Sequence, residues 1–273
     1  MDNEFGDAFG QLLADRCTPE VVRRIERGES AEPLWRDLVE SGFVDALVPE
    51  AQGGAGLSLH EVLPLVQACG YHALPVPFAE TMAARAVLAR AGRRWPVGAV
   101  TLDAIGDALP AEERRALHAA LTTAQIAGAA ARVLEMSIAH AQQRSQFGKP
   151  IGSFQAVQHQ LSVMAEQACA ARMAAQLSFA SAGHLPDHTL AAMGKCVAGE
   201  AEAVIAAGSH AVHGAIGITA EFDLQLYTRR LLAWRVQAGS PSHWAMQVAR
   251  QWWGGTHDRA IDFTLERLGA AQF

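Results

Sequence analysis

Hydrophobic residues recur at helical spacing through most of the chain. In the first third, one apolar stripe is formed by Leu59, Val62, Leu63 and Val66. Ser58 precedes this stripe and Glu61 follows three residues later, which is the spacing of a capping box. Pro75 and Pro77 force their predecessors out of the α region, so the chain is extended there before helix resumes. The pattern predicts helices separated by short loops up to about Gly92.

From residue 111 onward the chain is rich in alanine and is again helical. The apolar positions predict three long helices, the first capped by Thr122 or Thr123 and the second starting at Ser153. Asp187 caps the third, which runs to about Val212. Small residues at facing positions let such helices approach closely, as in an antiparallel bundle.

Two further helices are predicted near the end of the sequence. A short one covers Leu224 to Trp234, and a last one follows Ser240 as its cap, with Pro241 at the first helical position. The last helix carries a group of apolar side chains: Trp244, Val248, Trp252 and Trp253.

Residues 93–110 differ from both helical parts. They resemble a strand weakly, around Val97 to Ile105, but the segment is far too short to form a sheet domain. We therefore predict an all-α fold: an N-terminal helical domain over 1–92, a connector over 93–110, and a C-terminal antiparallel helix bundle over 111–273.

Composition excludes several classes of protein. Half of the 273 residues are hydrophobic and 18% are charged, which is incompatible with a disordered chain. A formal net charge of −6 offers no basic field for nucleic acid or anionic lipid. The longest charge-free run, residues 203–220, contains histidines and glycines and is too polar to span a membrane. The acidic first residues indicate no export signal, so a cytoplasmic protein is expected.

Several possible motifs have simpler explanations. Gly53, Gly54 and Gly56 follow no strand and precede no Gly-Lys-Ser, so they indicate a loop between helices. His210 and His213 have no third ligand in range, and the four cysteines show no CxxC spacing. No metal site and no disulfide framework is expected.

The segment from Arg144 to Gln155 is more informative. It joins two long helices and presents a guanidinium, an amide and an aromatic ring at Arg144, Gln146 and Phe147. A guanidinium binds phosphate oxygens through two hydrogen bonds, and an aromatic ring packs on a planar heterocycle. These residue types suit a nucleotide-like ligand.

The same segment resembles a signature of the acyl-CoA dehydrogenase family, in its C-terminal helical domain. Residues 48–57 resemble the loop of the family's N-terminal domain, and residues 212–230 resemble its later glycine motif with the following helix. The resemblance covers nearly the whole chain in the right order.

The departures from the family are as informative as the match. Members normally carry a β domain between their two helical domains, which binds the flavin and walls the acyl-CoA pocket; here only the 93–110 connector remains. The family's catalytic glutamate stands at one of two places, which here hold Ala238 and His118. Ala238 cannot accept a proton. At the second flavin contact, Ala211 and Ala215 replace residues that the family often keeps.

The resemblance implies a subunit of a heteromeric, FAD-dependent acyl-CoA dehydrogenase. It is similar to the short subunits of α2β2 enzymes that act on steroid or other bulky acyl-CoA substrates. The partner, a longer subunit, would supply the β domain and the base. By the same resemblance Arg144 pairs with the FAD diphosphate and Ser240 bonds flavin at a vestigial site. The remaining FAD contacts implied are Gln146, Phe147, Ile151 and Gln155.

Two alternatives remain open. The chain is a homomeric flavoenzyme that uses His118 or Asp223 as a displaced base, or it is a flavin-free scaffold that only binds a partner. The family also implies electron-transfer flavoprotein as the redox partner.

Overall fold

A computed structural model describes residues 4–269. Residues 1–3 and 270–273, which belong to the predicted N-terminal and C-terminal domains, lie outside the described residues. Its helices are α1 (Glu4–Arg16), α2 (Pro19–Glu26), α3 (Glu32–Glu40), α4 (Leu59–Tyr71), α5 (Phe78–Arg90), α6 (Ala111–Gln143), α7 (Gln155–Ser178), α8 (His188–His213), α9 (Leu224–Val236), α10 (Pro241–Trp253) and α11 (Ala260–Gly269). In the described part of the chain, strands are limited to the antiparallel pair β1 (Ser145–Gln146) and β2 (Lys149–Pro150). The all-α prediction is confirmed.

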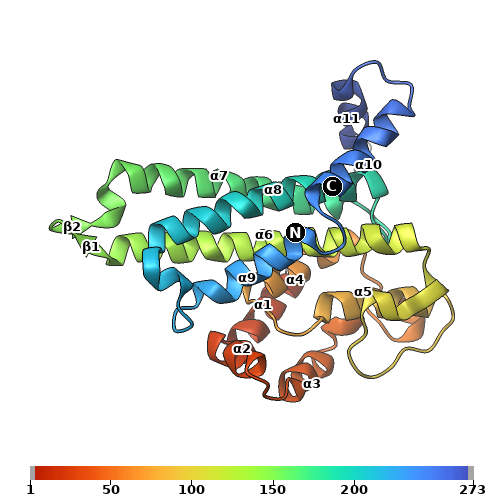
Figure 1. The fold of residues 1–273 in the computed structure, drawn as a ribbon. Helices are drawn as coiled ribbons and strands as arrows, with labels where there is room; N and C mark the ends of the chain where they lie inside the picture. The colour runs from red at the N-terminus through yellow and green to blue at the C-terminus, as the bar shows by residue number, and fades with distance from the viewer. Residues whose placement is uncertain (1–3, 270–273) are drawn as a thin grey trace.

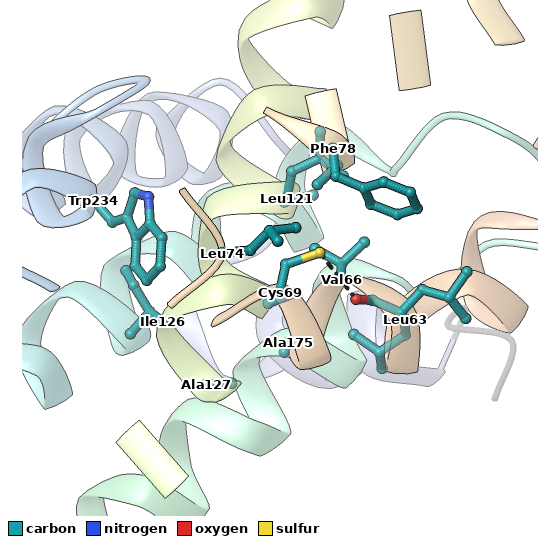
Figure 2. Close-up of a cluster of buried hydrophobic side chains, with 14 of the residues drawn as sticks. Leu63, Val66, Cys69, Leu74, Phe78, Leu121, Ile126, Ala127, Ala175 and Trp234 are labelled. Atoms are coloured by element: carbon teal, nitrogen blue, oxygen red, sulfur yellow. Dashed lines mark hydrogen bonds between the residues drawn. The ribbon is translucent and has the colours of Figure 1, made fainter. Parts of the chain in front are cut away.

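The long helices α6, α7 and α8 lie side by side and antiparallel, with α9 beside them (Figure 1). Helices α4 and α5 pack against α6, α1 packs on α4 and α2 on α9, and one hydrophobic core runs through both helical parts. Figure 2 shows this core where α4, α6, α7 and α9 meet: Cys69 lies among apolar side chains, and its thiol donates to the Leu65 carbonyl at 3.2 Å. No helix within residues 4–269 is long and apolar enough to cross a membrane.

The predicted helix starts follow from local capping chemistry. The Ser58 hydroxyl accepts from the Glu61 amide, and the Glu61 carboxylate accepts from the Ser58 amide at 2.8 Å, which completes the capping box. Asp187 caps α8 by accepting a hydrogen bond from the Leu190 amide, and Ser240 caps α10 by accepting one from the His243 amide. The predicted caps at Ser58, Asp187 and Ser240 are thus confirmed.

Three boundary predictions were wrong. Thr122 and Thr123 do not cap a helix, because α6 is continuous from Ala111 and both hydroxyls donate to carbonyls four residues back. Helix α7 begins at Gln155 rather than Ser153, after a short 3₁₀ turn. The helix with the tryptophans is not the last described one, since α11 follows it.

The connector forms no strand, contrary to the weak pattern around Val97 to Ile105. It folds onto α5 and ends in 3₁₀ turns over Leu102–Ala108. Side chains of α5 satisfy its backbone: Thr81 bonds both the amide and the carbonyl of Val100 at 3.0 Å, and Arg85 donates to the Val97 carbonyl at 2.9 Å. Because no neighbouring strand offers a ladder, these side chains take over the backbone hydrogen bonds.

Candidate functional site

The 145–150 hairpin lies at one end of the bundle, where α6 ends, α7 starts and α8 ends (Figure 1). Beside it is a hollow of about 470 Å³, here called the hairpin hollow. Its lining residues are His140, Arg144, Gln146, Phe147, Ile151, Phe154, Val157 and residues 211–215. Four of the sequence-predicted cofactor residues, Arg144, Gln146, Phe147 and Ile151, therefore meet in one place.

The hairpin is built from a tight turn with an unusual residue in it. Ser145 pairs with Pro150 and Gln146 with Lys149, which leaves Phe147 and Gly148 as the two turn residues. Both have positive φ, 52° and 79°, as a two-residue hairpin turn of this twist requires. A left-handed phenylalanine is strained by about 1–3 kcal/mol. Phe147 is also 90% exposed, so the fold keeps an aromatic ring in solvent although the backbone at this residue is strained.

The hairpin hollow carries an unpaired positive charge. The Arg144 guanidinium is exposed and has no ion pair with any residue of 4–269. His140 and His213 are stacked beside it, with ring centroids 4.4 Å apart. Burial lowers the pKa of both imidazoles, and for His140 the neighbouring Arg144 lowers the pKa further. Arg144 is thus the positive group of a hollow whose histidines are neutral.

Two predicted cofactor residues lie elsewhere. Gln155 is the exposed first residue of α7 and does not line the hairpin hollow, although it is close to it in sequence. Ser240 precedes α10 and does not line the hairpin hollow either; the following Pro241 lies against Gly199, near the middle of α8. The Ser240 hydroxyl accepts from the His243 amide at 3.2 Å and lies 2.9 Å from the Ser242 hydroxyl. Ser240 and Arg144 therefore belong to different regions of the surface.

The two positions expected for a base lie close together. His118 on α6 and Gln237, just after α9, are joined by a 2.9 Å contact between their Nε2 atoms, and Ala238 follows directly. A third residue, Glu80 of α5, places its Oε1 atom 3.6 Å from Nε2 of His118. Sequence reasoning did not single out Glu80, although it is the one acidic residue of α5.

The loop that carries Ala238 is fixed by buried donors. The Lys195 ammonium of α8 donates to the Trp234 carbonyl, and the Trp244 indole donates to the Ala238 carbonyl at 3.2 Å. Ala238 adopts a φ of 61°, so the turn is held in a conformation that alanine rarely adopts. Asp223, the other displaced base considered, forms an ion pair with Arg23 of α2.

A second hollow of about 440 Å³, here called the Glu80 hollow, adjoins this group. Its lining residues are Glu26, residues 74–77, Glu80, Gln125, Arg229, Arg230, Ala233, Trp234 and Gln237. Among residues 4–269, no three His, Cys, Asp or Glu side chains gather as a metal site would require.

Comparison with known proteins defines the class. The model of the acyl-CoA dehydrogenase C-terminal domain matches residues 111–267, and that of the N-terminal domain matches residues 2–94. The chain belongs to the acyl-CoA dehydrogenase family.

Particular relatives are similar over most of their length. Acyl-CoA dehydrogenase IpdE2 of Mycobacterium tuberculosis is 31% identical, over 82% of this chain and 88% of that protein. IpdE2 of Mycolicibacterium smegmatis is 28% identical, over 82% and 90%. Among solved structures, a variant of the steroid ACAD Tcur3481-Tcur3483 has a TM-score of 0.80 at 21% identity, over 92% of this chain and 97% of the other.

Two further solved structures have the same fold. The ChsE4-ChsE5 complex from Mycobacterium tuberculosis has a TM-score of 0.76 at 17% identity, with 94% of this chain and 99% of the other covered. The FAD complex of PigA has a TM-score of 0.76 at 14% identity, over 91% and 96%.

Proposed function

We propose that this chain is one subunit of a heteromeric, FAD-dependent acyl-CoA dehydrogenase that desaturates a CoA thioester with a bulky, steroid-type acyl group. Family membership gives the reaction class. The fold similarity to a steroid ACAD and to a two-protein complex supports the substrate class and the heteromeric assembly. The four free cysteines fit a reducing cytoplasm.

The observation that carries the proposal is the 145–150 hairpin. Phe147 is strained and 90% exposed, with its ring edge-on to Phe154, and Arg144 has no ion pair within residues 4–269. Both fit FAD: the guanidinium suits a diphosphate, and the ring and the Gln146 amide suit the adenosine part. Ile151 lines the same hollow, whereas Gln155, the first residue of α7, does not. FAD, when bound, supplies the hydride acceptor for dehydrogenation.

One face of a flavin site is present, and the remainder must come from elsewhere. Within residues 4–269 the only strands are β1 and β2, so no β domain covers the flavin ring. In this proposal residues 93–110 stand where the family has that domain, between helical parts 1–92 and 111–273. A longer acyl-CoA dehydrogenase subunit, in an α2β2 assembly, supplies it. Electron-transfer flavoprotein is the acceptor that the family implies.

The alternatives have less support. A homomeric enzyme with Asp223 as base is disfavoured because that carboxylate is engaged by Arg23. A flavin-free scaffold leaves the exposed Arg144 and the strained Phe147 without a purpose.

The test uses the chain expressed alone and together with its genomic neighbour. We expect a colourless protein alone and a yellow heterotetramer after co-expression, measured by absorption and light scattering. Arg144→Ala should lower the FAD content of the complex. Arg36→Ala is the matched control, because Arg36 is an exposed arginine of α3 outside both hollows. Unchanged FAD content in Arg144→Ala, or a yellow homo-oligomer of this chain, would overturn the proposal.

A further inference from the structure

The outer face of α7 and α8 is rich in exposed apolar side chains. These two helices lie on the side of α6 that faces away from α1–α5 (Figure 1). Met173 is 60% exposed, Val197 45% and Val204 37%. A contiguous apolar face in solvent marks an interaction surface.

The side chains of this face form two regular stripes. In each stripe, successive members are separated by four and three residues in alternation, and all of them are exposed or half-buried. This is the spacing of a seam along which one helix packs on another, as in a coiled coil. Together the stripes are here called the α7–α8 face: His159, Val163, Glu166, Ala170, Met173 and Leu177 on α7, and Met193, Val197, Glu200, Val204, Ala207 and Ala211 on α8.

Both stripes read the same when the chain direction is reversed. Their spacing of four, three, four, three and four residues is symmetric about position 168 on α7 and position 202 on α8. These midpoints lie at one level, because a β-carbon at Gly194 would touch Ala174 and one at Gly208 would touch Met164. One two-fold axis therefore passes through both midpoints, and each stripe meets its own copy antiparallel, as in a symmetric dimer.

The α8 stripe is complementary to its own reversed copy. Under the two-fold axis Met193 faces Ala211 of the second copy, and Val197 faces Ala207. Large side chains thus meet small ones, which is the arrangement that lets two helices interdigitate. Ala211 also lines the hairpin hollow, so the α7–α8 face ends where that hollow begins.

The two glutamates of the α7–α8 face do not oppose this contact. Glu200 faces Val204 of the second copy, and its carboxylate lies 3.6 Å from the guanidinium of Arg235 in the same chain. Glu166 faces the small Ala170. Neither glutamate is directly opposite its own copy, so like charges do not meet across the axis.

The size of the α7–α8 face matches a dimer contact. Between residues 159 and 177 a helix rises about 27 Å, and two adjacent helices are about 20 Å wide, which gives a flat area of roughly 540 Å² per copy. The accessible area of the side chains on it exceeds this flat area. Stable protein interfaces bury about 800 Å² per partner.

We infer that the α7–α8 face binds a second copy of this chain, antiparallel and related by a two-fold axis. The stoichiometry rests on the proposed function, because an α2β2 assembly contains two copies of this chain and this contact joins them. Arg144, Gln146 and Phe147 are not members of the α7–α8 face. They therefore stay available to a flavin held by the longer subunit.

The first test measures the mass of the chain expressed alone, by light scattering at several concentrations. The wild type should be a dimer, and Val197→Glu/Val204→Glu should be a monomer, because the contact would bury unpaired carboxylates. Both positions are exposed, so the circular dichroism spectrum should not change. Leu232→Glu/Val236→Glu, at two exposed apolar positions of α9, is the matched control and should stay dimeric.

A second test uses the co-expressed complex. Val197→Glu/Val204→Glu should halve its mass, to one copy of each chain, and keep the FAD content of each pair. In a Cys169→Ser background, which lacks the exposed native thiol, Val204→Cys lies beside the two-fold axis. A short bis-maleimide should then join two copies of this chain covalently, whereas Leu232→Cys should give no such product.

The outcomes separate this inference from the proposed function. A wild-type chain that is monomeric alone and gives no Val204→Cys cross-link in the complex would overturn the inference. A glutamate variant that loses the longer subunit would assign the α7–α8 face to that subunit and also overturn it. A colourless homodimer that the glutamates split, with no complex on co-expression, would support the inference and count against the proposed function.

Discussion

Gly128 of α6 lies directly against the backbone of Gln67 on α4. A β-carbon at Gly128 would stand 1.9 Å from the Gln67 carbonyl oxygen, and one at Gly70 would stand 2.0 Å from the Gln125 carbonyl oxygen. Each helix thus contributes one glycine, and the two backbones touch with no side chain between them. The N-terminal helices and the bundle are joined at this crossing.

Gly128→Ala should destabilise the fold. The obstacle is backbone rather than a flexible side chain, so the helices must separate, and we expect the free energy of unfolding to fall by about 1–3 kcal/mol. Urea denaturation followed by circular dichroism measures it. Gly10→Ala in α1 is the control, because nothing lies within 4 Å of its β-position. There, replacing a helical glycine should raise stability by up to about 1 kcal/mol. Equal effects of both changes would contradict the role of the crossing.

Lys195→Met should alter how stability depends on pH. Burial lowers the pKa of Lys195 from 10.5 to about 7. Between these values the unfolded chain binds a proton that the folded chain has released, so stability rises with pH, by up to about 1.4 kcal/mol per pH unit. Lys195→Met should flatten this rise between pH 7 and 10. The measurement is the urea midpoint at each pH. Lys149→Met, at the exposed other lysine, should keep the wild-type slope.

Phe147→Gly should separate stability from flavin binding. Glycine adopts the positive φ of the turn without strain, so the chain should gain about 0.5–1 kcal/mol. The complex should at the same time retain less FAD, because the aromatic ring is lost. Thermal unfolding and the absorption spectrum report the two effects. Phe147→Tyr keeps both the ring and the strain and should match the wild type. A Phe147→Gly complex with full FAD content would remove Phe147 from the proposed site.

The features predicted correctly from sequence depend on neighbouring residues. Ser58, Asp187 and Ser240 cap helices through bonds that span three residues, and such chemistry is visible in a short window. Thr122 was misjudged because a threonine inside a helix can donate to the preceding turn instead of capping. The weak strand pattern around Val97 to Ile105 is not realised, because Thr81 and Arg85, outside the segment, form the backbone hydrogen bonds of Val100 and Val97.

The candidate site shows the same limit. Arg144, Gln146, Phe147 and Ile151 are near in sequence, and the family signature places them together. His118 and Gln237 are 119 positions apart, so only the fold brings them into contact. Glu80 reaches them through the packing of α5 against α6, which no local pattern encodes.

The connector has a consequence for how such a chain arises. Because α4 and α6 hold each other through their backbones, the two helical parts do not need a domain between them to stay joined. A middle domain can therefore be lost as a unit, provided that the remaining segment closes the gap from α5 to α6. This segment also makes a specific contact, since its Leu102 amide donates a hydrogen bond to the Glu80 carboxylate. The segment that joins α5 to α6 thus also fixes the orientation of the Glu80 carboxylate.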